Sequence, residues 1–136
     1  MTLTSAFLCM ALNVYFESRG EPELGMKLVA QTTLNRAKHN ESEVCNAVLA
    51  PRQFSWTSVK LDGKRLNPQH RPTDFSKWSA SQQISERALI GALHLDQKWK
   101  GVTHFHNLQV KPVWATHKDM KYLGRVGNHH FYAYKP

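Results

Sequence analysis

The feature that most constrains the fold is a strongly apolar stretch near the N-terminus, whose apolar side chains recur at helical spacing. Thr4 can cap a helix that runs from there to about Arg19. Gly20 supplies the left-handed residue that commonly ends a helix, and Pro22 fits the first turn of the next one. The chain is therefore expected to begin with two helices joined by a tight turn.

Further helices are predicted beyond this turn. The second helix is expected to end at about Lys38. Ser42 is expected to cap a short third helix, which Pro51 stops. A fourth helix, with an apolar stripe at helical spacing, is expected to begin at Ser79 or Ser81.

Residues 51–79, between the third and fourth helices, follow no clean periodicity. They hold three prolines, several aromatic side chains and the turn signal Asp62-Gly63. A loop of this length in a compact domain is more often a working surface than a plain connection. The segment is therefore a candidate for part of a binding site. The alternative is that its aromatic side chains anchor it to the core, namely Phe54, Trp56, Phe75 and Trp78.

Two short strands are predicted after the helices, at Gly101 to His106 and at Gly127 to Tyr134. Helices come first and strands last, which indicates an α+β fold with a small antiparallel β element towards the C-terminus. The chain has 136 residues, of which 41% are hydrophobic, and this suits one domain with its own core, residues 1–136.

The charge balance suggests a polyanionic partner. Eighteen Lys and Arg against ten Asp and Glu leave a formal charge of +8, which attracts polyanions over a long range. The basic residues are scattered, without an arginine-rich arm, and this argues against nucleic acid. No apolar run approaches the roughly 18 residues that a membrane helix needs. We expect a monomer that neither binds nucleic acid nor inserts into a membrane.

The two cysteines, Cys9 and Cys45, leave two interpretations open. The favoured one is a pair of small, buried hydrophobic side chains. The alternative is a disulfide that forms after delivery to an oxidising compartment. A catalytic thiol is not indicated, because neither cysteine lies beside a histidine or a glycine-rich turn.

Glu17 is the first candidate for chemistry, because it lies at the end of the first helix directly after Tyr15 and Phe16. A carboxyl group held against aromatic walls loses hydration, and its pKa rises. A general acid needs such a pKa if it is to hold a proton near neutral pH. The alternative is a surface carboxylate paired with Arg19 or Arg36, and residue types alone favour this alternative.

Three neighbours of Glu17 are expected to support it. Glu21 is separated from Glu17 by a helix break, so it is expected to interact with the free N–H groups at the start of the second helix. Asn35 and Arg36, on the second helix, are expected to point back towards the acid and hold it through hydrogen bonds.

Histidines offer a different chemistry. His104 and His106 project from one face of a predicted strand, and His129 is a third candidate ligand. Three such side chains could bind zinc, as in a peptidoglycan amidase or peptidase. The signal is weak, because two histidines at this spacing are common and the chain has no HExxH helix.

The run Val14–Pro22, VYFESRGEP, resembles the VYxEARGEP signature of SleB-like cell wall hydrolases, a family named for a spore-cortex lytic enzyme. Four further landmarks follow in the family's order and cover nearly the whole chain. They are VAQTTLNRA at 29–37, QFS at 53–55, THFHN at 103–107 and GNHHFY at 127–132.

The resemblance implies a lysozyme-like helical fold and cleavage of the β-1,4 bond between N-acetylmuramic acid and N-acetylglucosamine in peptidoglycan. It places the catalytic acid at Glu17 and implies no metal or cofactor. The candidates for the glycan cleft are Gln53, Phe54, Ser55, His106, Asn107, His129 and Tyr132. The candidates for structural support of the site are Arg19, Glu21, Asn35 and Arg36.

The sequence offers no obvious second carboxylate to pair with Glu17, and a hydrolytic muramidase generally needs one. A lytic transglycosylase manages with a single acid and releases a 1,6-anhydro-muramic product. We therefore favour a transglycosylase, and the hydrolytic muramidase and the zinc amidase remain the alternatives.

The location of the enzyme is predicted from the N-terminal sequence, which lacks the basic start and cleavage site of a secretory signal. No wall-binding repeat or linker accompanies the catalytic motifs. This layout resembles a phage endolysin, which is made in the host cytoplasm and reaches the cell wall after a holin opens the membrane. The expected partner is the glycan strand of peptidoglycan.

Overall fold

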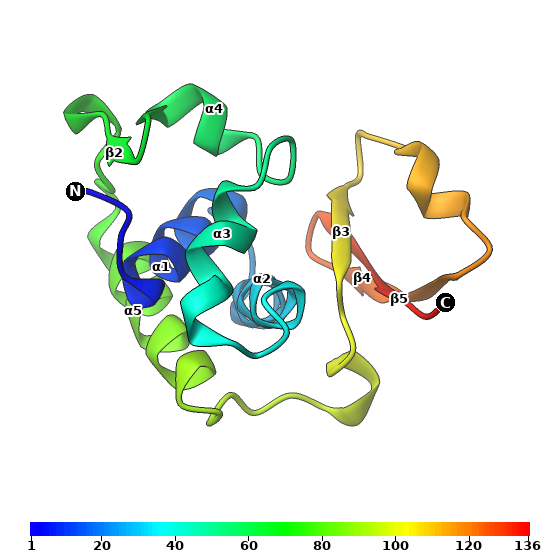
Figure 1. Cartoon of the computed structure of the whole chain (residues 1–136). Helices are drawn as coiled ribbons and strands as arrows, with labels where there is room; N and C mark the ends of the chain where they lie inside the picture. Colours follow the sequence, from blue (N-terminus) through cyan, green and yellow to red (C-terminus); the bar gives the residue numbers. More distant parts are fainter.

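A computed structural model, which describes all 136 residues, has five α-helices followed by an antiparallel sheet (Figure 1). The helices are α1 (Ala6–Glu17), α2 (Glu23–Arg36), α3 (Val44–Leu49), α4 (Trp56–Lys60) and α5 (Phe75–Leu89). The strands are β1 (Leu61–Asp62), β2 (Arg65–Leu66), β3 (His104–Asn107), β4 (Met120–Val126) and β5 (His129–Tyr134). The predicted α+β class is confirmed. No helix combines the length and the apolar character needed to cross a membrane.

The first helical turn is capped by Ser5, one residue later than predicted. The Ser5 hydroxyl accepts a hydrogen bond from the Leu8 N–H, 3.1 Å away. The helix ends at Glu17, and Gly20 takes the predicted positive φ of 80° in the turn. Pro22 lies directly before α2, whose first residue is Glu23. The predicted pair of helices is therefore confirmed, with ends that differ by one or two residues.

The predicted caps of the later helices are wrong. Ser42 does not cap α3; the Asn40 side chain accepts from the Ser42 N–H and starts a 3-10 turn before α3. Asp74 caps α5 by accepting from the Lys77 N–H, so Ser79 and Ser81 lie inside that helix. The apolar stripe did not reveal its first turn, because Phe75, the first residue of α5, is 83% exposed.

Residues 51–79 are more ordered than a long loop. They contain α4 and a two-stranded antiparallel hairpin in which Leu61 pairs with Leu66. The Asp62-Gly63 signal correctly marked the hairpin turn, where Gly63 has a φ of 60°. Arg65 in β2 also bridges to Thr2, so the hairpin holds the N-terminus of the chain.

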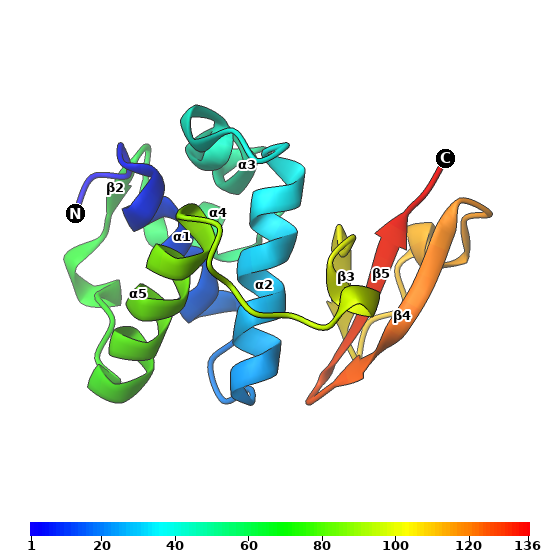
Figure 2. The same ribbon diagram turned by 90° about the horizontal axis from the view of Figure 1, so that it is seen from below.

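Helix α2 lies between the other helices and the sheet (Figure 2). One side of it contributes Met26, Val29 and Ala30 to a hydrophobic cluster shared with the other helices. Its other side contributes Leu28 to a smaller cluster with Trp99, Val102 and Phe131. A helix buried on both sides fixes the position of the sheet relative to α1.

The main sheet has the strand order β3-β5-β4, with both pairs antiparallel. Strand β3 begins at His104 rather than Gly101, and β5 begins at His129 rather than Gly127. Strand β4 was not predicted. The pairing register shifts between Tyr122 and Gly124. This irregularity breaks the alternation of buried and exposed side chains by which a strand is recognised from its sequence.

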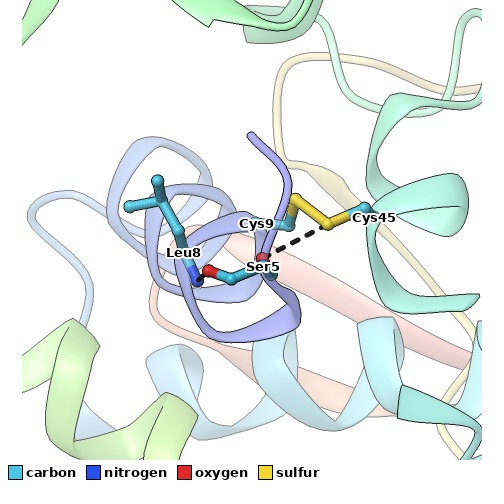
Figure 3. Close-up of a disulfide and its surroundings, with 4 residues drawn as sticks. All are labelled: Ser5, Leu8, Cys9 and Cys45. Carbon is cyan, nitrogen blue, oxygen red and sulfur yellow. Dashed lines mark hydrogen bonds between the residues drawn. A yellow bond between two sulfur atoms is a disulfide. The ribbon is translucent and has the colours of Figure 1, made fainter. Parts of the chain in front are cut away.

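Cys9 and Cys45 form a disulfide between α1 and α3, and their Cα atoms lie 5.3 Å apart (Figure 3). The favoured interpretation, two unlinked buried thiols, is therefore wrong, and no free cysteine remains. Figure 3 also shows the Cys45 sulfur next to the Ser5 carbonyl oxygen in the first turn of α1. The bond thus fixes the start of the helix that carries Glu17 at its other end.

Candidate active site

A groove of about 610 Å³ runs between the end of α1, the segment after α3 and the sheet. This volume is within the range of small-ligand sites. The side chains that line it are mostly polar or aromatic. They are Phe16, Glu17, Arg52, Gln53, Ser55, Ser58, Phe105, His106, Asn107, Val110, Pro112, Trp114 and His129.

Glu17 enters the groove from the last turn of α1, beside Phe16. Burial raises the pKa of Glu17 to about 7, and the positive charge of Arg36 offsets part of the rise. A carboxyl group with this pKa is about half protonated at neutral pH. It can therefore donate a proton under conditions where an ordinary glutamate is fully ionised.

The alternative in which Glu17 forms a surface ion pair is not observed. None of the ion pairs in the structure involves Glu17. The Arg19 guanidinium instead lies over the Tyr15 ring, 5.1 Å from its centroid. The support expected from Arg19 is thus limited to packing against the helix that ends in the acid.

Arg36 joins two walls of the groove. Its Nε donates to the Thr103 carbonyl oxygen at 2.7 Å, and its Nη1 donates to Gln53 Oε1 at 2.8 Å. The guanidinium also lies over the Phe54 ring. It makes no hydrogen bond to Glu17, so the predicted hydrogen bond is wrong, although its charge does act on the acid.

Asn35 is also turned away from the acid. Its Nδ2 donates to the carbonyl oxygens of Lys100 and Val102, at 2.9 and 2.7 Å. The hydrogen bonds that we expected between Asn35 and Glu17 are not formed. Asn35 instead fastens the segment before β3 to α2, which places β3 beside the groove.

Glu21 is buried and bonded to the β4–β5 turn rather than to the start of α2. Both carboxylate oxygens accept from the Asn128 N–H, and Oε1 lies 2.8 Å from His129 Nδ1. Gly127 has a φ of 57°, and a Cβ there would collide with the Glu21 carboxylate. The predicted contact with the start of α2 is therefore wrong, and the partner of Glu21 is a turn 107 residues away along the chain.

Most predicted cleft residues line the groove, namely Gln53, Ser55, His106, Asn107 and His129. Phe54 does not, because it is 2% exposed and packs in the core below the groove. Tyr132 does not line it either. Its hydroxyl lies 2.9 Å from His106 Nε2, so it supports that histidine from behind.

The most prominent residue that the sequence analysis missed is Trp114. It comes from the 3-10 turn Val113–Thr116 and packs at right angles on Tyr132, with His106 5.6 Å away between ring centroids. The sequence around Trp114 has no periodicity, and only the tryptophan itself and a nearby proline stand out there. Arg52, Val110 and Pro112 were missed for the same reason, since loop residues carry no periodicity. Ser58 was missed because it lies in α4, a short helix that was not predicted.

The three histidines proposed as zinc ligands have separate partners. Nδ1 of His104 lies 2.9 Å from the Thr103 hydroxyl. The two ring nitrogens of His106 contact Tyr132 and the Asn107 carbonyl oxygen, and His129 contacts Glu21. No group of three or more His, Cys, Asp or Glu side chains is arranged to hold a metal ion.

Comparisons with known proteins agree on one family. A family model described as Cell Wall Hydrolase matches residues 20–132. The catalytic domain of the germination-specific lytic transglycosylase SleB of Bacillus anthracis is similar, with 23% identity, 93% of each chain covered and a TM-score of 0.66. The catalytic domain of Bacillus cereus SleB has 24% identity and a TM-score of 0.63, with 93% of this chain and 88% of that chain covered. No curated protein matches.

Proposed function

Because the chain belongs to the cell wall hydrolase family, we propose that it cleaves the β-1,4 bond between N-acetylmuramic acid and N-acetylglucosamine in peptidoglycan. The observation that carries this proposal is the position of Glu17, an acid with a pKa of about 7 in a polar and aromatic groove. The solved SleB domains, one of them described as a lytic transglycosylase, support the same reaction.

Glu17 would donate its proton to the glycosidic oxygen as the bond to the muramic C1 stretches. The transition state resembles an oxocarbenium ion, so the leaving oxygen needs that proton early. Gln53, Ser55 and Asn107 would contact the hydroxyl and acetamido groups of the sugars, because their side chains can both donate and accept hydrogen bonds. Trp114 and Phe16 would contact the apolar faces of the sugar rings.

We favour a lytic transglycosylase over a hydrolase, because Glu17 is the only carboxylate that lines the groove. A hydrolase would need a second carboxylate, roughly 5–10 Å from the first. Glu21 is the nearest in sequence, and its carboxylate is buried against Asn128 and His129. In a transglycosylase, the muramic C6 hydroxyl attacks C1 instead of water.

Mass spectrometry of digested sacculi tests this choice. The expected products are muropeptides that end in 1,6-anhydro-muramic acid, because no water is consumed. Reducing-end muramic acid would show hydrolysis, and free stem peptides would show an amidase. Sacculi incubated without the enzyme provide the control, since growing cells leave some anhydro ends of their own.

We propose further that the enzyme acts as an endolysin, after release from the cytoplasm. The charge of +8 suits an anionic envelope, and the Cys9–Cys45 disulfide suits an oxidising compartment. Expression in a Gram-negative host is expected to leave the cells intact until a holin is co-expressed. Lysis without a holin would contradict this route, and a Glu17→Gln variant expressed with the holin controls for leakage through the holin alone.

A further inference from the structure

The main sheet has one face that no α-helix covers, which we call the outer face. Helix α2 packs against the opposite face (Figure 2), where Phe131 is buried. Side chains alternate between the two faces along β5, so His130 and Tyr132 point outward. The register pairs His130 with His106, and it pairs Tyr132 with Tyr122. These four side chains therefore share the outer face.

The segment between β3 and β4 folds over part of this face and leaves a pocket of about 290 Å³, which we call the outer pocket. His106, His130 and Tyr132 line it from the sheet, and Gln109 and Thr116 line it from the segment. The volume is close to the lower limit of small-ligand sites. The outer pocket therefore suits a small ligand or one unit of a polymer.

Contacts among the aromatic side chains hold one side of the outer pocket in place. The Tyr122 hydroxyl lies 2.8 Å from His130 Nδ1, and the Tyr132 hydroxyl lies 2.9 Å from His106 Nε2. The ring centroids of His106 and His130 are 5.3 Å apart, and those of Tyr122 and Tyr132 are also 5.3 Å apart. Rings that hold one another in this way need little reordering when a ligand binds.

The outer pocket presents polar and apolar surface side by side. The rings of His130 and Tyr132 offer apolar faces and polar edges, and Gln109 adds an amide that both donates and accepts hydrogen bonds. Leu108 and Val110 also line the outer pocket and are 38% and 51% exposed. A sugar ring has the matching combination, because its C–H faces are apolar and its hydroxyl groups lie around the edge.

The charge of the outer pocket argues against an ionic ligand. No Asp or Glu lines it, so a cation finds no carboxylate there, and Lys111 is its only Lys or Arg. Burial, His106 and Arg125 lower the pKa of His130 from its ordinary value of 6.5, so this ring is neutral at neutral pH. The composition thus favours an uncharged ligand that carries hydroxyl groups.

The outer pocket and the groove meet at β3, which is an edge strand of the sheet. His106 and Val110 line both. Trp114 of the groove packs at right angles on Tyr132 of the outer pocket, with the ring centroids 5.3 Å apart. A chain of sugars bound in the groove can therefore continue past β3 into the outer pocket.

From this arrangement we propose that the outer pocket binds a sugar unit of the same glycan strand, beyond the two sugars whose bond is cleaved. The inference rests on the proposed function, because the strand that reaches the outer pocket is the one that Glu17 cleaves. The outer face then determines the preferred substrate length, since a longer strand gains a contact that a short one lacks. Binding energy from this remote unit helps to hold the reacting bond beside Glu17.

Cleavage of soluble glycan oligomers tests the proposal. The substrates are a tetrasaccharide and an octasaccharide of alternating N-acetylglucosamine and N-acetylmuramic acid, prepared from uncross-linked peptidoglycan. Wild-type kcat/KM, counted per cleavable bond, is expected to be about tenfold higher for the octasaccharide. One or two additional hydrogen bonds contribute about this much to binding.

Two variants of the outer pocket are expected to remove this preference. His130→Ala deletes a polar ring, and Ala115→Trp fills the outer pocket with a bulky side chain. Each is expected to lower kcat/KM for the octasaccharide by about tenfold, to near the tetrasaccharide value. The matched control is His94→Ala, an exposed histidine outside both the groove and the outer pocket. It is expected to keep the wild-type ratio.

Binding can also be observed without cleavage, by NMR titration of the Glu17→Gln protein. The octasaccharide is expected to shift the backbone amide signals of Gln109, Thr116 and His130. The tetrasaccharide is expected to shift chiefly signals of the groove, such as those of Gln53 and Ser55.

The outcomes separate this proposal from the proposed function. Equal cleavage of both oligomers per bond, or a length preference that survives in both variants, would overturn the proposal. If neither variant folds, as judged by thermal unfolding, unmoved amide signals of the outer pocket in the titration would overturn it equally. A Glu17→Gln enzyme that stays active would refute the proposed function, whereas the length preference would still report on the outer pocket.

Discussion

Glu17→Gln is expected to lower the rate of glycan cleavage by about 1,000-fold or more, measured as soluble muropeptides released from purified sacculi. Glutamine has nearly the same shape but no acidic proton. Without that proton, the leaving sugar would depart as an alkoxide. No other carboxyl group lines the groove to protonate it. The matched control is Glu23→Gln, a carboxylate on α2 that is 73% exposed and is expected to keep full activity.

The same substitution is expected to stabilise the fold above neutral pH. The Glu17 pKa is 4.5 in an ordinary environment and about 7 in the folded protein. Between these values the unfolded chain releases a proton that the native chain keeps, so native stability falls as pH rises. At pH 8 the loss of unfolding free energy is up to about 3 kcal/mol. The Glu17→Gln variant avoids this loss, because glutamine does not ionise. An inactive variant that also melts lower than wild type at pH 8 would indicate a damaged fold instead.

Removal of the disulfide is expected to cost about 4 kcal/mol of unfolding free energy in a Cys9→Ala/Cys45→Ala variant. The bond closes a loop with a sequence separation of 36, so it strongly restricts the unfolded chain. Denaturant unfolding of the oxidised, reduced and double-alanine forms measures the difference. Reduced wild type separates the crosslink from the loss of side-chain packing, because it keeps both sulfur atoms.

A different result would change the account of α1. A reduced protein within about 1 kcal/mol of the oxidised one would show that helix packing alone holds α1 against α3. In that case the disulfide would not matter for placing Glu17. The thiol count of the native protein provides a direct control, since no free cysteine is present in the structure.

The helical part of the fold could be predicted because its signals are local. Gly20 and Pro22 mark the turn between α1 and α2, and apolar spacing marks α1 itself. Glu17 could be proposed as an acid because its aromatic neighbours precede it directly in the sequence. Residue types alone favoured a surface ion pair for Glu17. The resemblance to a hydrolase family then made the catalytic acid the preferred interpretation.

The remaining features depend on contacts between distant residues. Nothing near Cys9 or Cys45 shows that their Cα atoms lie 5.3 Å apart. Glu21 was assigned to the nearest free N–H groups, yet it reaches Asn128, 107 residues away. Phe54 belongs to a motif that otherwise lines the groove, and only the packing shows that its ring turns into the core. Sequence patterns show neither which distant residues are in contact nor which way a side chain packs.

The central claim is that Glu17 holds a proton near neutral pH inside the groove. Carbon-13 NMR titration of the glutamate side-chain carboxyl groups measures this directly, and the Glu17→Gln spectrum identifies the Glu17 signal. We predict that one glutamate titrates with a pKa of about 7 and that its signal is absent from the variant. A Glu17 signal that titrates near 4.5, like an ordinary glutamate, would contradict the account.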